Sequence, residues 1–156
     1  MRYSRLVGWF KGWLAEAYLL KGDPAHAATE AQLGLEISRA TGFTWAVGLA
    51  QRALGTIARR RGDLGDAEAK LSESLATFTV IQSRLDAGRS HLALAELLQA
   101  QAEPERAAEH VEAARERLVG AVRQGNATAG WGGAAGLGSD PDCVGIASVA
   151  AWALRM

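Results

Sequence analysis

The fold of this chain is decided by a six-residue stretch at positions 22–27, Gly-Asp-Pro-Ala-His-Ala, which is followed by two related stretches. These are Gly-Asp-Leu-Gly-Asp-Ala at 62–67 and Ala-Glu-Pro-Glu-Arg-Ala at 102–107, so successive copies lie 40 residues apart. Gly, Asp and Pro are typical of the point where one helix ends and the next begins. Three copies at one spacing predict a repeat protein.

Helical periodicity flanks each copy of the turn. A large residue and a small one precede it at a fixed offset, and a further residue follows the large one by four positions, which places both on one helix face. The pairs are Leu14-Ala15, Leu54-Gly55 and Leu94-Ala95, and the residues that follow are Tyr18, Ala58 and Leu98. Pro24 and Pro104 suit the first turn of a helix. Breaks at Thr41-Gly42 and Gln82-Ser83 then predict three helical hairpins, at about 5–42, 43–82 and 83–122.

Small residues at equivalent positions explain how each hairpin would close. Ala15, Gly55 and Ala95 on the first helices would lie against Ala27, Ala67 and Ala107 on the second helices. Leucines, with Tyr18, Trp13 and Trp45, would fill the space between neighbouring hairpins. One hairpin cannot bury its apolar stripe alone, so stacking is required. We therefore expect an all-α solenoid over residues 1–123.

These residues resemble the tetratricopeptide repeat (TPR). That family places a large-small pair in the first helix, then an aromatic or aliphatic residue four positions on, a Gly-Asp turn and an alanine. The chain departs from the pattern at the early tryptophan position, which holds Lys11, Gln51 and His91, and its period of 40 exceeds the usual 34. The resemblance implies an α-α superhelix whose first helices line a concave groove.

Residues 5–120 are also similar to the C-terminal repeat regions of bacterial LuxR-type ATP-binding regulators and of predicted ATPase/nucleotide-cyclase proteins. The resemblance implies a non-catalytic scaffold or regulatory region that binds a peptide or partner helix. The alternative is that the chain is the C-terminal regulatory fragment of a larger ATP-dependent signalling protein or transcriptional regulator, whose catalytic or DNA-binding domains lie outside it.

The composition changes after residue 123. Seven of the 18 glycines lie between Gly120 and Gly138, and no fourth copy of the repeat follows. Residues 124–156 therefore read as a Gly/Ala-rich tail that is flexible or weakly ordered. The glycines at 130–136 imitate a dinucleotide-binding loop, but no strand precedes them and no helix start follows. We expect no cofactor.

The charge balance and the apolar stretches limit the partners. Seventeen basic and 17 acidic side chains give a formal net charge of zero, whereas a dedicated nucleic-acid binder carries a basic surface. The apolar stretch at 143–154 has about twelve residues, and a membrane span needs about 20. The N-terminus lacks the pattern of a signal peptide. We expect a cytoplasmic protein that binds neither nucleic acid nor membrane.

Catalytic and metal-binding motifs are missing from the sequence. His26, His91 and His110 fall in different helical segments, and no spacing pairs them as metal ligands. A single cysteine, Cys143, excludes a disulfide framework and lacks a basic neighbour that would activate it. No Gly-Lys-Ser/Thr phosphate loop occurs. The prediction is a protein that is not an enzyme and holds no metal.

The family's spacing places one set of side chains on the groove. On the first helix these are Trp9, Glu16 and Leu20. The candidate partner-binding residues on the next two are Arg52, Thr56, Arg59, Arg60, Arg89, Glu96 and Gln99. Guanidinium groups suit a carboxylate-bearing ligand, so the partner would be a protein or peptide, and an acidic peptide would match these arginines. Under the alternative, the arginines at 59–61 only complement the dipole at a helix C-terminus.

The N-terminal helix carries an unusual number of aromatic residues for a terminal repeat, which normally has a polar outer face. They are Tyr3, Trp9, Phe10 and Trp13. Three interpretations are open: a packed aromatic core, an absent neighbour upstream, or self-association through this helix.

Overall fold

The computed structural model describes residues 2–123, and within them every regular element is an α-helix, so the all-α prediction is confirmed for this part of the chain. The helices are α1 (Arg2–Lys21), α2 (Pro24–Ala40), α3 (Thr44–Arg61), α4 (Leu64–Val80), α5 (Arg84–Ala100) and α6 (Pro104–Arg123). None of these six helices has the length and apolar character to cross a membrane. The predictions for the tail, its glycine loop and Cys143 concern residues outside the described range.

The helix ends follow from local chemistry. Asp23 and Asp63 are the N-caps of α2 and α4, where each side chain accepts a hydrogen bond from the N–H three residues on, at 3.1 and 3.2 Å. Pro24 begins α2 and Pro104 begins α6, as predicted. The preceding turns need a left-handed residue. Gly22 and Gly62 supply it at φ +83°, whereas Ala102 adopts φ +60° without that freedom.

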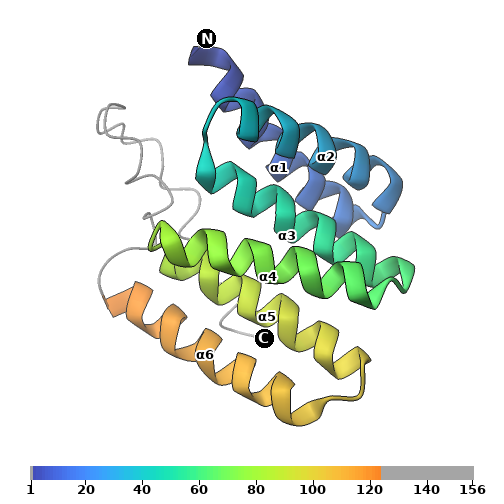
Figure 1. The fold of residues 1–156 in the computed structure, drawn as a ribbon, viewed down its shortest axis with the longest axis vertical. Coiled ribbons are helices and arrows are strands. Elements are labelled where there is room, and N and C mark those ends of the chain that lie inside the picture. Colours follow the sequence, from blue (N-terminus) through green and yellow to red (C-terminus); the bar gives the residue numbers. More distant parts are fainter. Residues whose placement is uncertain (1, 124–156) are drawn as a thin grey trace.

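The helices form two layers. Each odd-numbered helix packs against the next even-numbered one, and α2 and α4 also pack against the helix that follows them. In addition α1 contacts α3 and α3 contacts α5, so α1, α3 and α5 lie side by side as one layer. Figure 1 shows the helices stacked along the long axis, from α1 and α2 at one end to α6 at the other. We call α1, α3 and α5 the first helices. The outer surface that these three helices form together is called the first-helix face.

The predicted small residues are buried between the layers. Ala15, Ala27 and Ala67 have no exposed area, and Ala107 keeps 3%. A Cβ on Gly55 would lie 2.7 Å from Leu71 Cγ, so only glycine fits there without a shift. The large residue of the first pair departs from the expectation: Leu14 is 40% exposed.

A second set of close contacts was not predicted from the sequence. Gly8, Gly48 and Gly88 lie 40 residues apart on the first helices. A Cβ at these positions would come within 2.5 Å of Ser38 Oγ, 2.9 Å of Phe78 Cζ and 2.9 Å of Leu118 Cγ, respectively. These glycines let the two helices of each pair approach closely near one end. Trp13 and Trp45 pack against the buried cluster of Leu49, Phe78 and Ala87, to which α3, α4 and α5 each contribute one residue.

Candidate functional site

One buried arginine links the three first helices. Arg52, on α3, lies 2.8 Å from the carboxylate of Glu16 on α1 and 3.4 Å from that of Asp86 on α5, measured from the guanidinium nitrogens. It is only 6% exposed, and Asp86 is 2% exposed. Since one side chain pairs with both neighbouring helices, it fixes how α1, α3 and α5 lie relative to one another.

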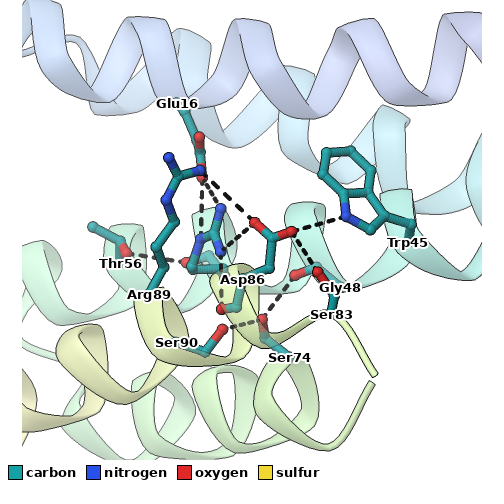
Figure 2. Close-up of polar contacts among 10 residues, drawn as sticks. Glu16, Trp45, Gly48, Thr56, Ser74, Ser83, Asp86, Arg89 and Ser90 are labelled. Carbon is teal, nitrogen blue, oxygen red and sulfur yellow. Dashed lines mark hydrogen bonds and ion pairs between the residues drawn. The ribbon is translucent and has the colours of Figure 1, made fainter. Parts of the chain in front are cut away.

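The Asp86 carboxylate contacts further donor groups, as Figure 2 shows. The indole Nε1 of Trp45 donates to its Oδ2 at 2.9 Å, and the Ser83 hydroxyl lies 2.8 Å from the same oxygen. Arg89 lies 3.8 Å from Oδ1. Asp86 belongs to the first turn of α5, where the helix dipole favours a carboxylate. Its charge is therefore satisfied within the chain.

The electrostatics keep Arg52 charged. Burial disfavours the charged guanidinium, but the nearby Glu16 and Asp86 carboxylates outweigh that penalty and raise the pKa of Arg52 above its usual value. The guanidinium carbon also lies 5.4 Å from the centre of the Phe78 ring, within the range of a cation–π contact. Arg52 thus directs four hydrogen bonds to groups within the chain, two to Glu16 and two to Asp86.

Most of the other predicted groove residues also have partners inside the chain. Arg59 pairs with Glu96 at 2.7 Å, and Arg60 donates to the carbonyl oxygen of Leu19 at 2.8 Å. Thr56 donates to the carbonyl oxygen of Arg52 one turn earlier. Gln99 is exposed. The structure therefore brings Arg52 and Arg89 together on Asp86, and pairs Arg59 with Glu96, within the first-helix face.

A buried hydroxyl pair lies next to this network. Ser74, on α4, donates to the carbonyl oxygen of Gly48 at 2.8 Å, and its hydroxyl is 2.9 Å from that of Ser90 on α5. Figure 2 shows the pair below Asp86. These contacts satisfy polar groups between α3, α4 and α5, and they leave no activated nucleophile with a base beside it.

Two histidines meet between α5 and α6. The Nδ1 atoms of His91 and His110 are 2.8 Å apart. The spacing of the two histidines did not predict this contact, which arises because the antiparallel α5–α6 pair brings positions 19 residues apart side by side. Two nitrogens do not make a metal centre. Within residues 2–123 no group of three or more His, Cys, Asp or Glu side chains could hold an ion.

The environment of the pair disfavours protonation. Burial, with the nearby His110 and Arg117, lowers the pKa of His91 to about 4. The pKa of His110 is lowered by burial and by Arg106, against an opposing effect of Glu109 and Glu68. Both rings are therefore neutral at pH 7, so one Nδ1 donates and the other accepts.

A small cavity lies elsewhere, between α2, α3 and α4. Its volume is about 190 Å³, below the roughly 300 Å³ at which cavities for small organic ligands begin. It is lined by Ala28, Gln32, Leu54, Ile57, Ala58, Arg61, Asp63, Asp66 and Lys70. We assign it no ligand.

The Asp86 contacts, the Ser74–Ser90 pair and the histidine pair are polar features that were not predicted from the sequence. A signal for Asp86 was present, because Ser83 and Asp86 have the spacing of a helix-capping motif. No signal pointed to Trp45 as its partner 41 residues away. The histidines carried a weaker one, since His91 and His110 lie on either side of the turn at 102–103, in the two helices of one expected hairpin.

Comparisons with protein-family models, with curated proteins and with solved structures find no match for this chain. The tetratricopeptide resemblance therefore stays a prediction from the sequence.

Proposed function

We propose that residues 2–123 are a tetratricopeptide-like solenoid that acts as a non-catalytic protein-interaction scaffold, with the first-helix face as the surface that binds a peptide or partner helix. One observation carries the proposal: Glu16, Arg52 and Asp86 join all three first helices through a single buried cation. A face whose helices are fixed in advance loses less entropy when a partner binds.

The solenoid assignment is supported by spacing. The second helices begin at Pro24, Leu64 and Pro104, 40 residues apart, and the close-approach glycines at 8, 48 and 88 share that spacing. The resemblance of residues 5–120 to repeat regions of bacterial regulators would place such a scaffold at the regulatory end of a larger signalling protein.

The partner's chemistry follows from what the face leaves exposed. Leu20 is 88% exposed, and the side chains of Arg59 and Arg89 keep 26% and 33% of their area despite their carboxylate partners. An acidic peptide would have to compete with those carboxylates. We therefore propose a peptide or helix with both apolar and polar side chains, in which an acidic residue reaches Arg59 or Arg60.

Selection from a displayed library of random 15-residue peptides on the immobilised full chain tests the proposal. The affinity of each enriched peptide would be measured by calorimetry for the wild-type chain and for the double variant Leu20→Ser, Gln99→Ala. We expect the double variant to bind at least tenfold more weakly. The matched control is Val80→Ser, because Val80 is 79% exposed but lies on α4. The proposal fails if no peptide is enriched, or if the control loses as much affinity as the double variant.

A further inference from the structure

An uncovered apolar stripe runs along α1. Its members, Leu6, Val7, Phe10 and Leu14, are 40%, 42%, 60% and 40% exposed. Residues four apart lie on one face of a helix, so Leu6, Phe10 and Leu14 form a continuous row. We call these four residues the α1 stripe. Glu16 lies six positions after Phe10 and, at about 100° per residue, points to another side of α1.

The equivalent positions on α3 and α5 are covered. Shifting Leu6 and Phe10 by 40 residues gives Ala46 and Ala50, both with no exposed area, and a further 40 gives Asp86 and Ser90, at 2% and 0%. On α3 and α5 the preceding helices pack on these helices. The α1 stripe is thus the part of a repeated, normally buried surface that no described residue covers.

Side-chain size argues against another hairpin in the same register. The residue of α3 that corresponds to Phe10 is the buried Ala50, and that of α5 is the buried Ser90. α1 carries Phe10 there. Overpacking by several carbon atoms would force the approaching helix away. The stripe therefore suits a partner helix that packs at a larger distance, with its own bulky side chains.

The opposite end of the molecule is a poor partner for the stripe. α6 exposes three valines, at 111, 119 and 122, but Glu112, Arg115 and Glu116 are exposed among them, with Arg115 paired to Glu112. Stacking α6 of one copy on α1 of another would remove these charges from water without opposing charges on the stripe. A surface that matches the stripe in polarity is the stripe itself.

We propose that two copies of this chain associate through α1, antiparallel, about a two-fold axis at Phe10. The spacing 6, 10, 14 is symmetric about residue 10, so Leu6 would face the partner's Leu14 and the two Phe10 rings would meet. The charges allow this arrangement, because Lys11 already pairs with Glu30 at 2.6 Å and the Arg5 guanidinium lies 5.3 Å from the centre of the Phe43 ring. Such self-complementarity is what a two-fold interface requires. This inference is independent of the proposed peptide-binding face.

Sedimentation velocity of the full chain between about 1 and 300 µM tests the proposal. A single helix pair is a small interface, so we expect a monomer–dimer equilibrium in the micromolar range. Phe10→Asp should weaken dimerisation at least 30-fold, whereas Leu20→Asp, an exposed position of α1 outside the stripe, should leave it unchanged. Circular dichroism checks that both variants keep their helices. A chain that stays monomeric, or a Phe10→Asp variant that still dimerises, overturns the proposal.

Cross-linking tests the geometry. In a Cys143→Ser background, Phe10→Cys should form a disulfide-linked dimer on mild oxidation, because residue 10 lies on the two-fold axis, whereas Leu20→Cys should not. Equal cross-linking of both overturns the antiparallel arrangement. If the Phe10→Cys variant is a monomer and its cysteine resists thiol reagents, the chain covers its own stripe. If the variant is a monomer and that cysteine reacts, the stripe binds another partner. Either result overturns the dimer.

Discussion

α1 and α6 lie at opposite ends of the row of helices, and their uncovered faces differ. α1 exposes the apolar row of Leu6, Phe10 and Leu14, whereas the exposed valines of α6 are separated by charged residues such as Glu112 and Arg115. Position 115 corresponds to Leu75 of α4, which is partly buried. A charged side chain at that position on α6 favours contact with water over packing against another helix. A repeated helix can therefore lie at the end of a stack when charged residues replace apolar ones at its outer positions, and α1 lacks such replacements.

The two ends also differ in the ion pairs that stabilise their helices, and Arg52→Ala should give the largest difference in the free energy of unfolding. α1 depends on a buried ion pair, and its removal leaves Asp86 with the more distant Arg89. We expect a loss of about 3 kcal/mol in the free energy of unfolding, measured by urea denaturation. Arg115→Ala on α6 removes a fully exposed ion pair and should leave the midpoint unchanged. Equal losses in the two variants would contradict the comparison.

The α6 end should be the acid-sensitive one, because His91 and His110 lie between α5 and α6. Below pH 6.5 an unfolded histidine binds a proton, but folded His91, with a pKa of about 4, does not. Stability from this pair is present above pH 6.5 and is lost as the pH falls towards 4. After allowance for solvent screening, we expect a loss of about 2 kcal/mol.

Urea denaturation at pH 7.5, 5.5 and 4 measures this loss. Carboxylates contribute to any acid effect, so the informative quantity is the difference between the wild-type chain and His91→Gln. His26→Gln, which changes an exposed histidine beside Asp23, is the matched control. If His91→Gln shows the same pH slope as the wild type, the histidine pair does not control acid stability.

Close approach of helices also distinguishes the ends. A Cβ on Gly8 would lie 2.5 Å from Ser38 Oγ and 3.2 Å from the Ser38 backbone nitrogen, so Gly8→Ala should cost about 1.5 kcal/mol. On Gly88 it would lie 2.9 Å from Cγ of the partly exposed Leu118, whereas the nearest backbone atom, the Ala114 carbonyl oxygen, is 3.5 Å away, at an ordinary contact distance. Gly88→Ala should therefore cost less than half as much in thermal or urea unfolding. A larger loss at Gly88 would reverse the expectation.

The helices could be predicted from the sequence because their ends depend on local chemistry. Asp23 and Asp63 cap helices through the N–H three residues on, and Pro24 fits the first turn, so nothing distant is needed. The all-α composition follows from these ends and from the apolar spacing between them. Gly8, Gly48 and Gly88 were equally visible at the same period, but their role depends on the partner at 38, 78 or 118.

The candidate site could be predicted only in part, because the partner of a guanidinium is not local. Spacing placed Arg52 and Arg89 on neighbouring helices, and both do lie near Asp86. Whether Arg52 meets a ligand or a carboxylate depends on Glu16 and Asp86, which are 36 and 34 residues away. Helical periodicity fixes the face of each residue but not the pairing across that face.

The hairpin turns give the smallest expected difference between the ends. Gly22 before α2 and Ala102 before α6 are both left-handed, at φ +83° and +60°. A side chain in this conformation costs about 1 kcal/mol, and glycine recovers it but adds about 0.5 kcal/mol of chain entropy. Ala102→Gly should therefore stabilise the chain by about 0.5 kcal/mol, and Gly22→Ala should destabilise it by a similar amount. Differential scanning calorimetry of the two variants measures both; a destabilising Ala102→Gly would show that α6 depends on the stiffness of its turn more than on relief of backbone strain.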